Sequence, residues 1–237
     1  MGETPMPRRK QPGAAGFVFH VMNRSAKRLT LFESRDDYEL FHRCLVSALQ
    51  GEPIRIYAFC VMPNHFHLVL GPERDGQVAT FMKRLTGRHG QLWHVARKTS
   101  GSGAVYQGRY RAVPVQTDQH FLTLCRYVER NALRAGLVAR AEDWEWGSAW
   151  MRCRKSSVIA LSEWPIPQPS SWLSILNSQE SIEEAGMIRR SIARGLPFGD
   201  RDWQALAARN LGLESSLRPR GRPAATRAEQ EAGISSP

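Results

Sequence analysis

Two histidines separated by one residue, His65 and His67, are the clearest candidates for chemistry in the sequence. They follow the turn-forming pair Pro63-Asn64 and lead into apolar residues, which predicts a strand that begins at the first histidine. The two-residue period of a strand places both imidazoles on one face, where their neutral nitrogens could bind a divalent cation with little ordering cost. A third ligand would come from elsewhere. The tripeptide alone favours the simpler interpretation, a hydrogen-bonded pair at a sheet surface.

A second candidate group lies on a predicted helix that begins after Thr117-Asp118. Tyr127 and Asn131 are four residues apart, so they are neighbours on one helix face, at the edge of an apolar stripe. His120 lies near the same edge and is a candidate general base, although the sequence identifies none with certainty. The other tyrosines occupy apparent core positions or lack a polar partner of this kind.

The charge balance indicates a polyanionic partner. The 237 residues include 33 Lys and Arg against 22 Asp and Glu, a net charge of +11, which favours nucleic acid first and an anionic membrane second. No apolar run reaches the roughly 18 residues of a membrane span, and no signal core follows the basic N-terminus, so we expect a soluble, intracellular protein. The four cysteines form no Cys-x-x-Cys pair, which argues against a zinc ribbon or a disulfide framework.

Basic residues also gather between Asp75 and Asp118, a stretch without any acidic residue. Ordinary helix surfaces mix the two signs of charge, so this excess predicts contact with phosphates. Trp93, Tyr106 and Tyr110 in the same stretch could stack on unpaired bases or belong to the core. The basic residues of the stretch are Lys83, Arg84, Arg88, Arg97, Lys98, Arg109 and Arg111.

The predicted elements alternate in a way that is typical of a ferredoxin-like (RRM-like) α+β fold, with an antiparallel sheet and helices packed on one face. A turn is expected at Asn23-Arg24, and the second helix is expected to be kinked or broken near Gly87 and Gly90. The elements are a strand at 16–22, a helix at 34–51, a hairpin of strands at 54–62 and 65–70, a helix at 77–98, a strand at 109–116 and a helix from 117.

Several ordered blocks resemble a known family. His65-Phe66-His67 matches the His-hydrophobic-His motif of the HUH endonucleases, and Tyr127 to Asn131 matches their Tyr-x-x-x-polar helix. Residues 21–24, 61–68, 107–110 and 126–137 together are similar to the REP-associated tyrosine transposases, relatives of the single-tyrosine insertion-sequence transposases. The resemblance spans roughly residues 16–150. Ala132 stands where relatives often have proline, and Asn131 where other insertion-sequence relatives have Gln.

The resemblance implies a mechanism. His65, His67 and Asn131 would hold Mg²⁺ or Mn²⁺, and Tyr127 would attack the scissile phosphate of single-stranded hairpin DNA to give a 5′-phosphotyrosine and a free 3′-hydroxyl. The DNA would be a repetitive extragenic palindrome with a flanking tetranucleotide. Two alternatives stay open: a ferredoxin-like nucleic-acid-binding module without catalysis, and a metal-dependent phosphodiesterase that uses water. Whether the protein is a monomer or a homodimer is also open.

The chain is expected to divide into a disordered basic tail (1–15), the transposase-like catalytic domain (16–150), a linker or irregular segment (151–180), a helical C-terminal region (181–213) and a second disordered basic tail (214–237). Two helices in the C-terminal region could form a DNA-binding helix-turn-helix or, more simply, a packed hairpin. Arg220 and Arg222 lie in an AT-hook-like pentapeptide that could enter a minor groove or act as a generic basic tail. Arg24 completes the predicted DNA contacts, and a bacterial, nucleoid-associated location is expected.

Overall fold

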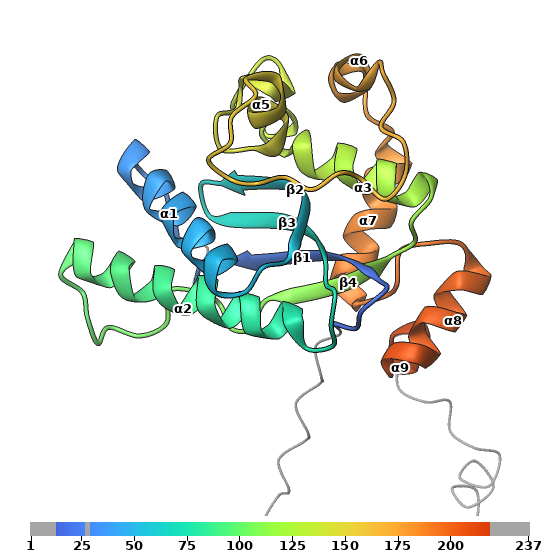
Figure 1. Cartoon of the computed structure of the whole chain (residues 1–237), viewed down its shortest axis with the longest axis horizontal. Coiled ribbons are helices and arrows are strands. Elements are labelled where there is room, and N and C mark those ends of the chain that lie inside the picture. The colour runs from blue at the N-terminus through green and yellow to red at the C-terminus, as the bar shows by residue number, and fades with distance from the viewer. Residues whose placement is uncertain (1–12, 27–28, 219–237) are drawn as a thin grey trace, which may run out of the picture.

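A four-stranded antiparallel sheet with helices on both faces forms the centre of the computed structural model, which describes residues 13–26 and 29–218 (Figure 1). Its order is β2-β3-β1-β4, the predicted ferredoxin-like order. The strands are β1 (Val18–Arg24), β2 (Arg55–Met62), β3 (His65–Gly71) and β4 (Arg111–Val115). Helices α1 (Arg35–Gly51) and α2 (Gln77–Arg97) cover one face, as predicted, but α3 (Gln119–Glu129) packs on the other.

The alternation of side chains along β3 separates two cores. Phe66, Leu68 and Leu70 are fully buried with α1 and α2, because every second residue points to that face. Val69 points to the α3 side, and the two histidines share its face. Burial of each large apolar side chain contributes about 1.5–3 kcal/mol, so both faces of the sheet are firmly held.

Two local predictions were wrong because tertiary contacts outweigh local signals. The first strand continues through Asn23 and Arg24, where a turn was expected, because these residues pair with Phe66 and His65 of β3. Helix α2 is not broken near Gly87 and Gly90 but runs continuously from Gln77 to Arg97, although each glycine in it costs about 1 kcal/mol relative to alanine. Its packing on α1 through a buried apolar stripe compensates for this cost.

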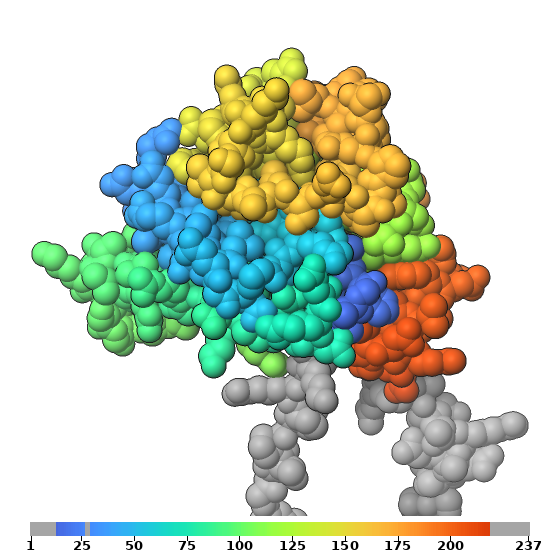
Figure 2. Space-filling view, in the orientation of Figure 1, coloured from blue at the N-terminus to red at the C-terminus, as the bar shows by residue number. Residues whose placement is uncertain are grey.

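The described second half of the chain consists of helices, of which three pack against α3. Figure 2 shows the yellow part of this segment, which begins near residue 145, in contact with the blue part of the chain that carries α1. Trp172 and Leu176, which belong to the segment 151–180 that was predicted to be a linker, have buried side chains. The short helices are α4 (Asn131–Arg134), the 3₁₀ helix η2 (Ala141–Asp143), α5 (Ser148–Cys153), α6 (Trp172–Asn177), α7 (Ile182–Arg194), α8 (Arg201–Leu211) and α9 (Glu214–Leu217).

The predicted tail at 214–237 begins with helix α9, whose Ser216 is buried, so its first four residues were wrongly assigned to disorder. Residues 219–237, which include Arg220, Arg222 and the AT-hook-like pentapeptide, lie outside the described residues, as do residues 1–12. None of the helices in residues 13–26 and 29–218 has the length and apolar character needed to cross a membrane.

A buried carboxylate anchors α3 to the short helices. Glu129 is 2 % exposed and accepts hydrogen bonds from Ser148 Oγ at 2.5 Å, from Trp172 Nε1 at 2.8 Å and from Arg152. A buried charge is tolerated when it is paired and fully hydrogen-bonded, as here. Glu129 therefore fixes the helix that carries Tyr127 relative to α5 and α6.

Arg97, which was predicted to contact DNA, has an intramolecular partner. Its guanidinium donates to both carboxylate oxygens of Asp37 at 2.9 Å and lies 4.3 Å over the ring of Trp93. Burial alone would raise the pKa of Asp37, but hydrogen bonds from Arg97 and from two backbone amides lower it below the usual 3.8. The pair joins the end of α2 to the start of α1.

We predict that Arg97→Ala destabilises the protein by about 2–4 kcal/mol, because the Asp37 carboxylate stays buried without its cation. Since the folded-state pKa of Asp37 is lowered, the stabilisation is present above pH ~4 and declines as the pH falls further. Urea unfolding at pH 7 and pH 3.5 measures both effects. Arg88→Ala, on the exposed side of the same helix, is the control; equal stability of the two variants at pH 7 would contradict a structural role for Arg97.

Candidate active site

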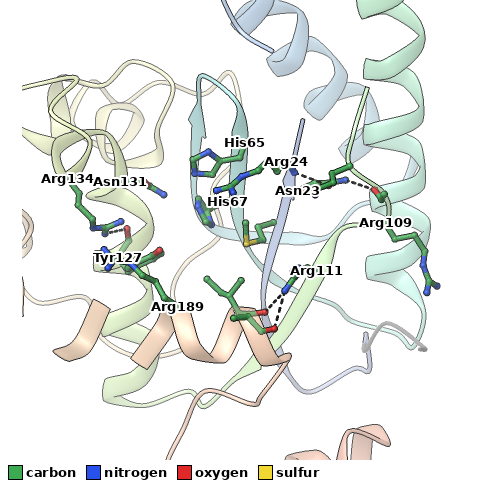
Figure 3. A pocket seen from close by; sticks show the side chains of 15 residues that line it. Asn23, Arg24, His65, His67, Arg109, Arg111, Tyr127, Asn131, Arg134 and Arg189 are labelled. Atoms are coloured by element: carbon green, nitrogen blue, oxygen red, sulfur yellow. Dashed lines mark hydrogen bonds between the residues drawn. The ribbon is translucent and has the colours of Figure 1, made fainter. Parts of the chain in front are cut away.

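One cavity of about 670 Å³ brings together the residues that the sequence singled out (Figure 3). His65 and His67 of β3, Tyr127 of α3 and Asn131 of α4 all line it. Arg24, Arg109 and Arg111 line it as well, although Arg109 extends away from the histidines. The other basic residues of the stretch before Asp118 lie on or at the end of α2, which packs on the opposite face of the sheet. Lys98 is the C-cap of this helix, and the residues within it are Lys83, Arg84, Arg88 and Arg97.

Each cavity histidine has one ring nitrogen engaged in a hydrogen bond. His65 Nδ1 lies 2.7 Å from Asn64 Oδ1, so this nitrogen carries the proton and donates. His67 Nδ1 lies 2.8 Å from Nε2 of His20, a buried residue of β1. The remaining nitrogen of each ring, Nε2, is the one that a cation could use.

Both imidazoles are held in the neutral form that binds metal ions. Burial, together with the nearby Arg24 and Arg134, lowers the pKa of His65 to about 4. Burial and the neighbouring His20 and His65 hold the pKa of His67 well below its usual range. Neither ring therefore needs to lose a proton at neutral pH before a cation binds.

Tyr127 and Asn131 reach the same cavity because the chain stays helical across the junction of α3 and α4. Arg130 is the single residue between α3 and α4, and it keeps a right-handed helical conformation. The spacing of four residues therefore places the side chains of Tyr127 and Asn131 on one side of the helix. The Tyr127 ring stands edge-on to His67, with 6.0 Å between ring centroids. Asn131 Nδ2 is buried without a hydrogen-bond partner, as is Nε of Arg24.

Arg134 lies directly over the Tyr127 ring, and the sequence analysis assigned it no role. Its guanidinium carbon is 4.0 Å from the ring centroid, and Nη2 donates to the Tyr127 carbonyl oxygen at 2.7 Å. Glu180 holds the same guanidinium through two hydrogen bonds of 2.7 and 2.9 Å. The seven-residue spacing, two helical turns on one face, was the signal that could have identified it.

Helix α7 also lines the cavity, through Arg189, Ile192 and Ala193. Arg111 donates to the carbonyl oxygens of Ile192 and Ala193 at 3.0 and 3.3 Å, which ties the end of α7 to β4. Nothing in the local sequence of α7 signals this position, because it depends on contacts with distant residues. His120, by contrast, bonds to Asp118 and packs on Phe198 without lining the cavity, so it is not placed as a base.

The donors present fit a divalent cation. Two neutral imidazoles point into the cavity, and a half-turn of the unpartnered Asn131 amide would present its oxygen as a third ligand. Within residues 13–26 and 29–218, no three His, Cys, Asp or Glu side chains gather as a metal site, so the amide is essential to this set. The described lining contains five arginines and no Asp or Glu, which makes the cavity suited to an anion such as phosphate.

Comparisons with known proteins give one family match and similarities to solved structures. Residues 15–131 match the family described as "Transposase IS200 like". The fold is similar to that of a REP-associated tyrosine transposase bound to a REP hairpin, with 18% identity, a TM-score of 0.51, and coverage of 68% of this chain and 89% of that chain. A candidate transposase from Deinococcus radiodurans R1 is 17% identical over 52% of this chain and 97% of that chain, with a TM-score of 0.37. No curated protein matches the sequence.

We predict that Arg134→Ala makes residues 180–194, which begin with Glu180 and include α7, open more readily to solvent. Loss of charge-assisted hydrogen bonds worth about 1.5–3 kcal/mol should speed amide hydrogen exchange at 180–194 by about tenfold or more. Exchange measured by mass spectrometry tests this. Arg140→Ala removes an ion pair with Glu142 in which the arginine is exposed, and it should leave the exchange at 180–194 unchanged. Equal exchange in the two variants would show that Arg134 does not anchor the segment.

Proposed function

We propose that this chain, whose residues 15–131 match the family described as "Transposase IS200 like", is a transposase of that kind: a metal-dependent endonuclease that cuts and rejoins single-stranded hairpin DNA through Tyr127. The observation that carries the proposal is the cavity that gathers this tyrosine, two neutral histidines and an unpartnered amide among five arginines. A protein that binds phosphates and transfers a strand needs such a set of groups. The catalytic unit would comprise residues 16–150 completed by the C-terminal helices, and it would act in the bacterial cytoplasm at the nucleoid.

His65, His67 and Asn131 would hold the cation, Mg²⁺ or Mn²⁺. When bound, it would supply Lewis-acid polarisation of the scissile phosphate. The three protein ligands are all neutral, so the charge of the cation would be balanced by the anionic substrate and not by carboxylates. The hydrogen bonds of His65 with Asn64 Oδ1 and of His67 with His20 would hold the two rings in the orientation that the ligand set requires.

Tyr127 would be the nucleophile. Its phenol oxygen forms a bond to the phosphorus and loses its proton, while the bond from phosphorus to the 3′-oxygen breaks and that oxygen takes up a proton. The reverse reaction, with a new 3′-hydroxyl as nucleophile, joins strands without ATP because the phosphotyrosine conserves the bond energy. Arg134, stacked on the ring, and Arg189 of α7 lie on the cavity wall, where they would stabilise the charge of the phosphate during transfer.

The hairpin DNA is proposed from three features. The cavity is lined by arginines without carboxylates, the chain has a net charge of +11, and the fold resembles a transposase that was bound to a REP hairpin. Arg24, Arg109 and Arg111 would contact the strand near the cavity, and Lys83, Arg84, Arg88 and Lys98 would contact DNA beyond it. We leave Arg97 out of this set because its donors are bound to Asp37. Arg220 and Arg222 remain proposed contacts of the tail.

We predict that Tyr127 becomes covalently joined to the 5′ side of the cut DNA. Incubation with 3′-labelled hairpin DNA and Mg²⁺, followed by a denaturing protein gel, should give a labelled band that Tyr127→Phe lacks. Tyr110→Phe is a matched control, because the Tyr110 hydroxyl is buried without a hydrogen-bond partner and its loss should leave the band intact. An adduct in Tyr127→Phe would identify another nucleophile. Cleavage without any adduct would favour a water-using phosphodiesterase, and DNA binding without cleavage a binding module.

We also predict that cleavage stops in EDTA and returns with Mg²⁺ or Mn²⁺. His65→Ala and His67→Ala should each lower the cleavage rate by at least about a hundredfold, since a Lewis acid contributes several kcal/mol to the transition state. Hairpin binding, measured by fluorescence anisotropy, should persist because the arginines remain. His120→Ala, outside the cavity, should cleave normally. Cleavage that resists the chelator would remove the metal from the proposal.

A further inference from the structure

His20 is a buried histidine that touches the cavity residues without lining the cavity. It is 2 % exposed, and its ring lies beside that of His67, with centroids 5.0 Å apart. Its Nε2 is occupied by the 2.8 Å hydrogen bond to His67 Nδ1. His20 is therefore not placed as a direct ligand of a cation in the cavity, and its position calls for another explanation.

The shared hydrogen bond has two possible proton positions, and they have opposite consequences. If His67 Nδ1 carries the proton and donates to His20, then His67 Nε2 has a free lone pair directed toward the cavity. If His20 donates instead, the proton of His67 sits on Nε2 and blocks a cation there. Only an acceptor at residue 20 gives the first arrangement.

We propose that His20 is a positioning residue that accepts the Nδ1 proton of His67 and so fixes the tautomer and ring orientation in which Nε2 can bind the cation. The inference rests on the proposed function and extends it to a residue outside the ligand set. Histidines that bind metals commonly donate their second nitrogen to such a partner, and loss of the partner typically costs 10–100-fold in metal affinity.

The backbone holds this contact in place. In the antiparallel pairing of β1 with β3, Met22 lies opposite His67 and His20 opposite Val69, so the two histidines are diagonal neighbours on one face. The ring of Tyr127 stands edge-on to His20, with 6.4 Å between centroids, and closes the other side. His65 has its own acceptor in Asn64, but that residue lies in the partly exposed hairpin turn, where solvent can replace it. The buried His67 Nδ1 has no comparable substitute for His20.

The test compares Mn²⁺ binding to the purified full chain without DNA, measured by electron paramagnetic resonance of free Mn²⁺. His20→Phe keeps a ring of similar size and removes the acceptor, and it should weaken Mn²⁺ binding about 10–100-fold. His20→Gln, whose amide oxygen can accept, should recover most of the affinity. His42→Phe is the matched control, because His42 is also a buried histidine but packs on the α1 side of the sheet.

A second measurement does not depend on the variants folding. Nitrogen-15 spectra of histidine rings in the metal-free wild type distinguish a protonated nitrogen from one with a lone pair, and His67 should carry its proton on Nδ1. A proton on Nε2, or unchanged Mn²⁺ affinity in a folded His20→Phe, would overturn the role of His20. A wild type that binds no Mn²⁺ even with hairpin DNA present would instead overturn the metal site of the proposed function, and the inference with it.

Discussion

The pairing of β1 with β3 is the constraint on which the cavity depends. Its register sets Arg24 opposite His65 and Met22 opposite His67, and it brings His20 beside His67. A slip by one residue would turn every one of these side chains to the opposite face, among the apolar residues under α1 and α2. The large apolar side chains on that face exclude such a slip, so the core on one side of the sheet fixes the chemistry on the other.

A cavity with five arginines and no described carboxylate also has an electrostatic cost, and the C-terminal helices reduce it. Glu180 neutralises Arg134, and the last carbonyl oxygens of α7, the negative end of the helix dipole, accept from Arg111. Arg126 likewise donates to carbonyl oxygens of Ile175 and Gln179. The arginines of the cavity and of α3 thus hold the segment that completes the cavity wall, so fold and site depend on the same charges.

The parts of the site that the sequence predicted are those that depend on local periodicity. The face shared by His65 and His67 follows from the two-residue period of a strand, and the joint approach of Tyr127 and Asn131 follows from helical spacing. The parts that it missed depend on pairing between distant segments. Arg24 was predicted as a DNA contact, but a turn was expected there, and its place beside the histidines depends on its pairing with β3. Helix α7 lines the cavity because Arg111 holds its end, and Arg97 leaves the predicted basic surface because Asp37 lies beside it. His20 could have been placed from the sequence, because Phe17, Phe19 and Val21 alternate along the predicted strand 16–22 and leave His20 on the opposite face.

The cavity is one of the places where the structure leaves buried polar groups without a hydrogen-bond partner. The buried Asn131 Nδ2 and Arg24 Nε have no partner, and an unsatisfied buried polar group costs about 1–3 kcal/mol, or more when it is charged. Burial lowers the pKa of His20 to about 3 and keeps the neighbouring rings neutral, so they offer lone pairs rather than charges. An anion beside Arg24 would accept from its Nε, and a half-turn of the Asn131 amide would replace the unpartnered Nδ2 with Oδ1, which a cation could bind. A donor that suits a phosphate and an amide that could bind its metal, lining one cavity, are the physical basis for proposing that this cavity carries out phosphoryl transfer.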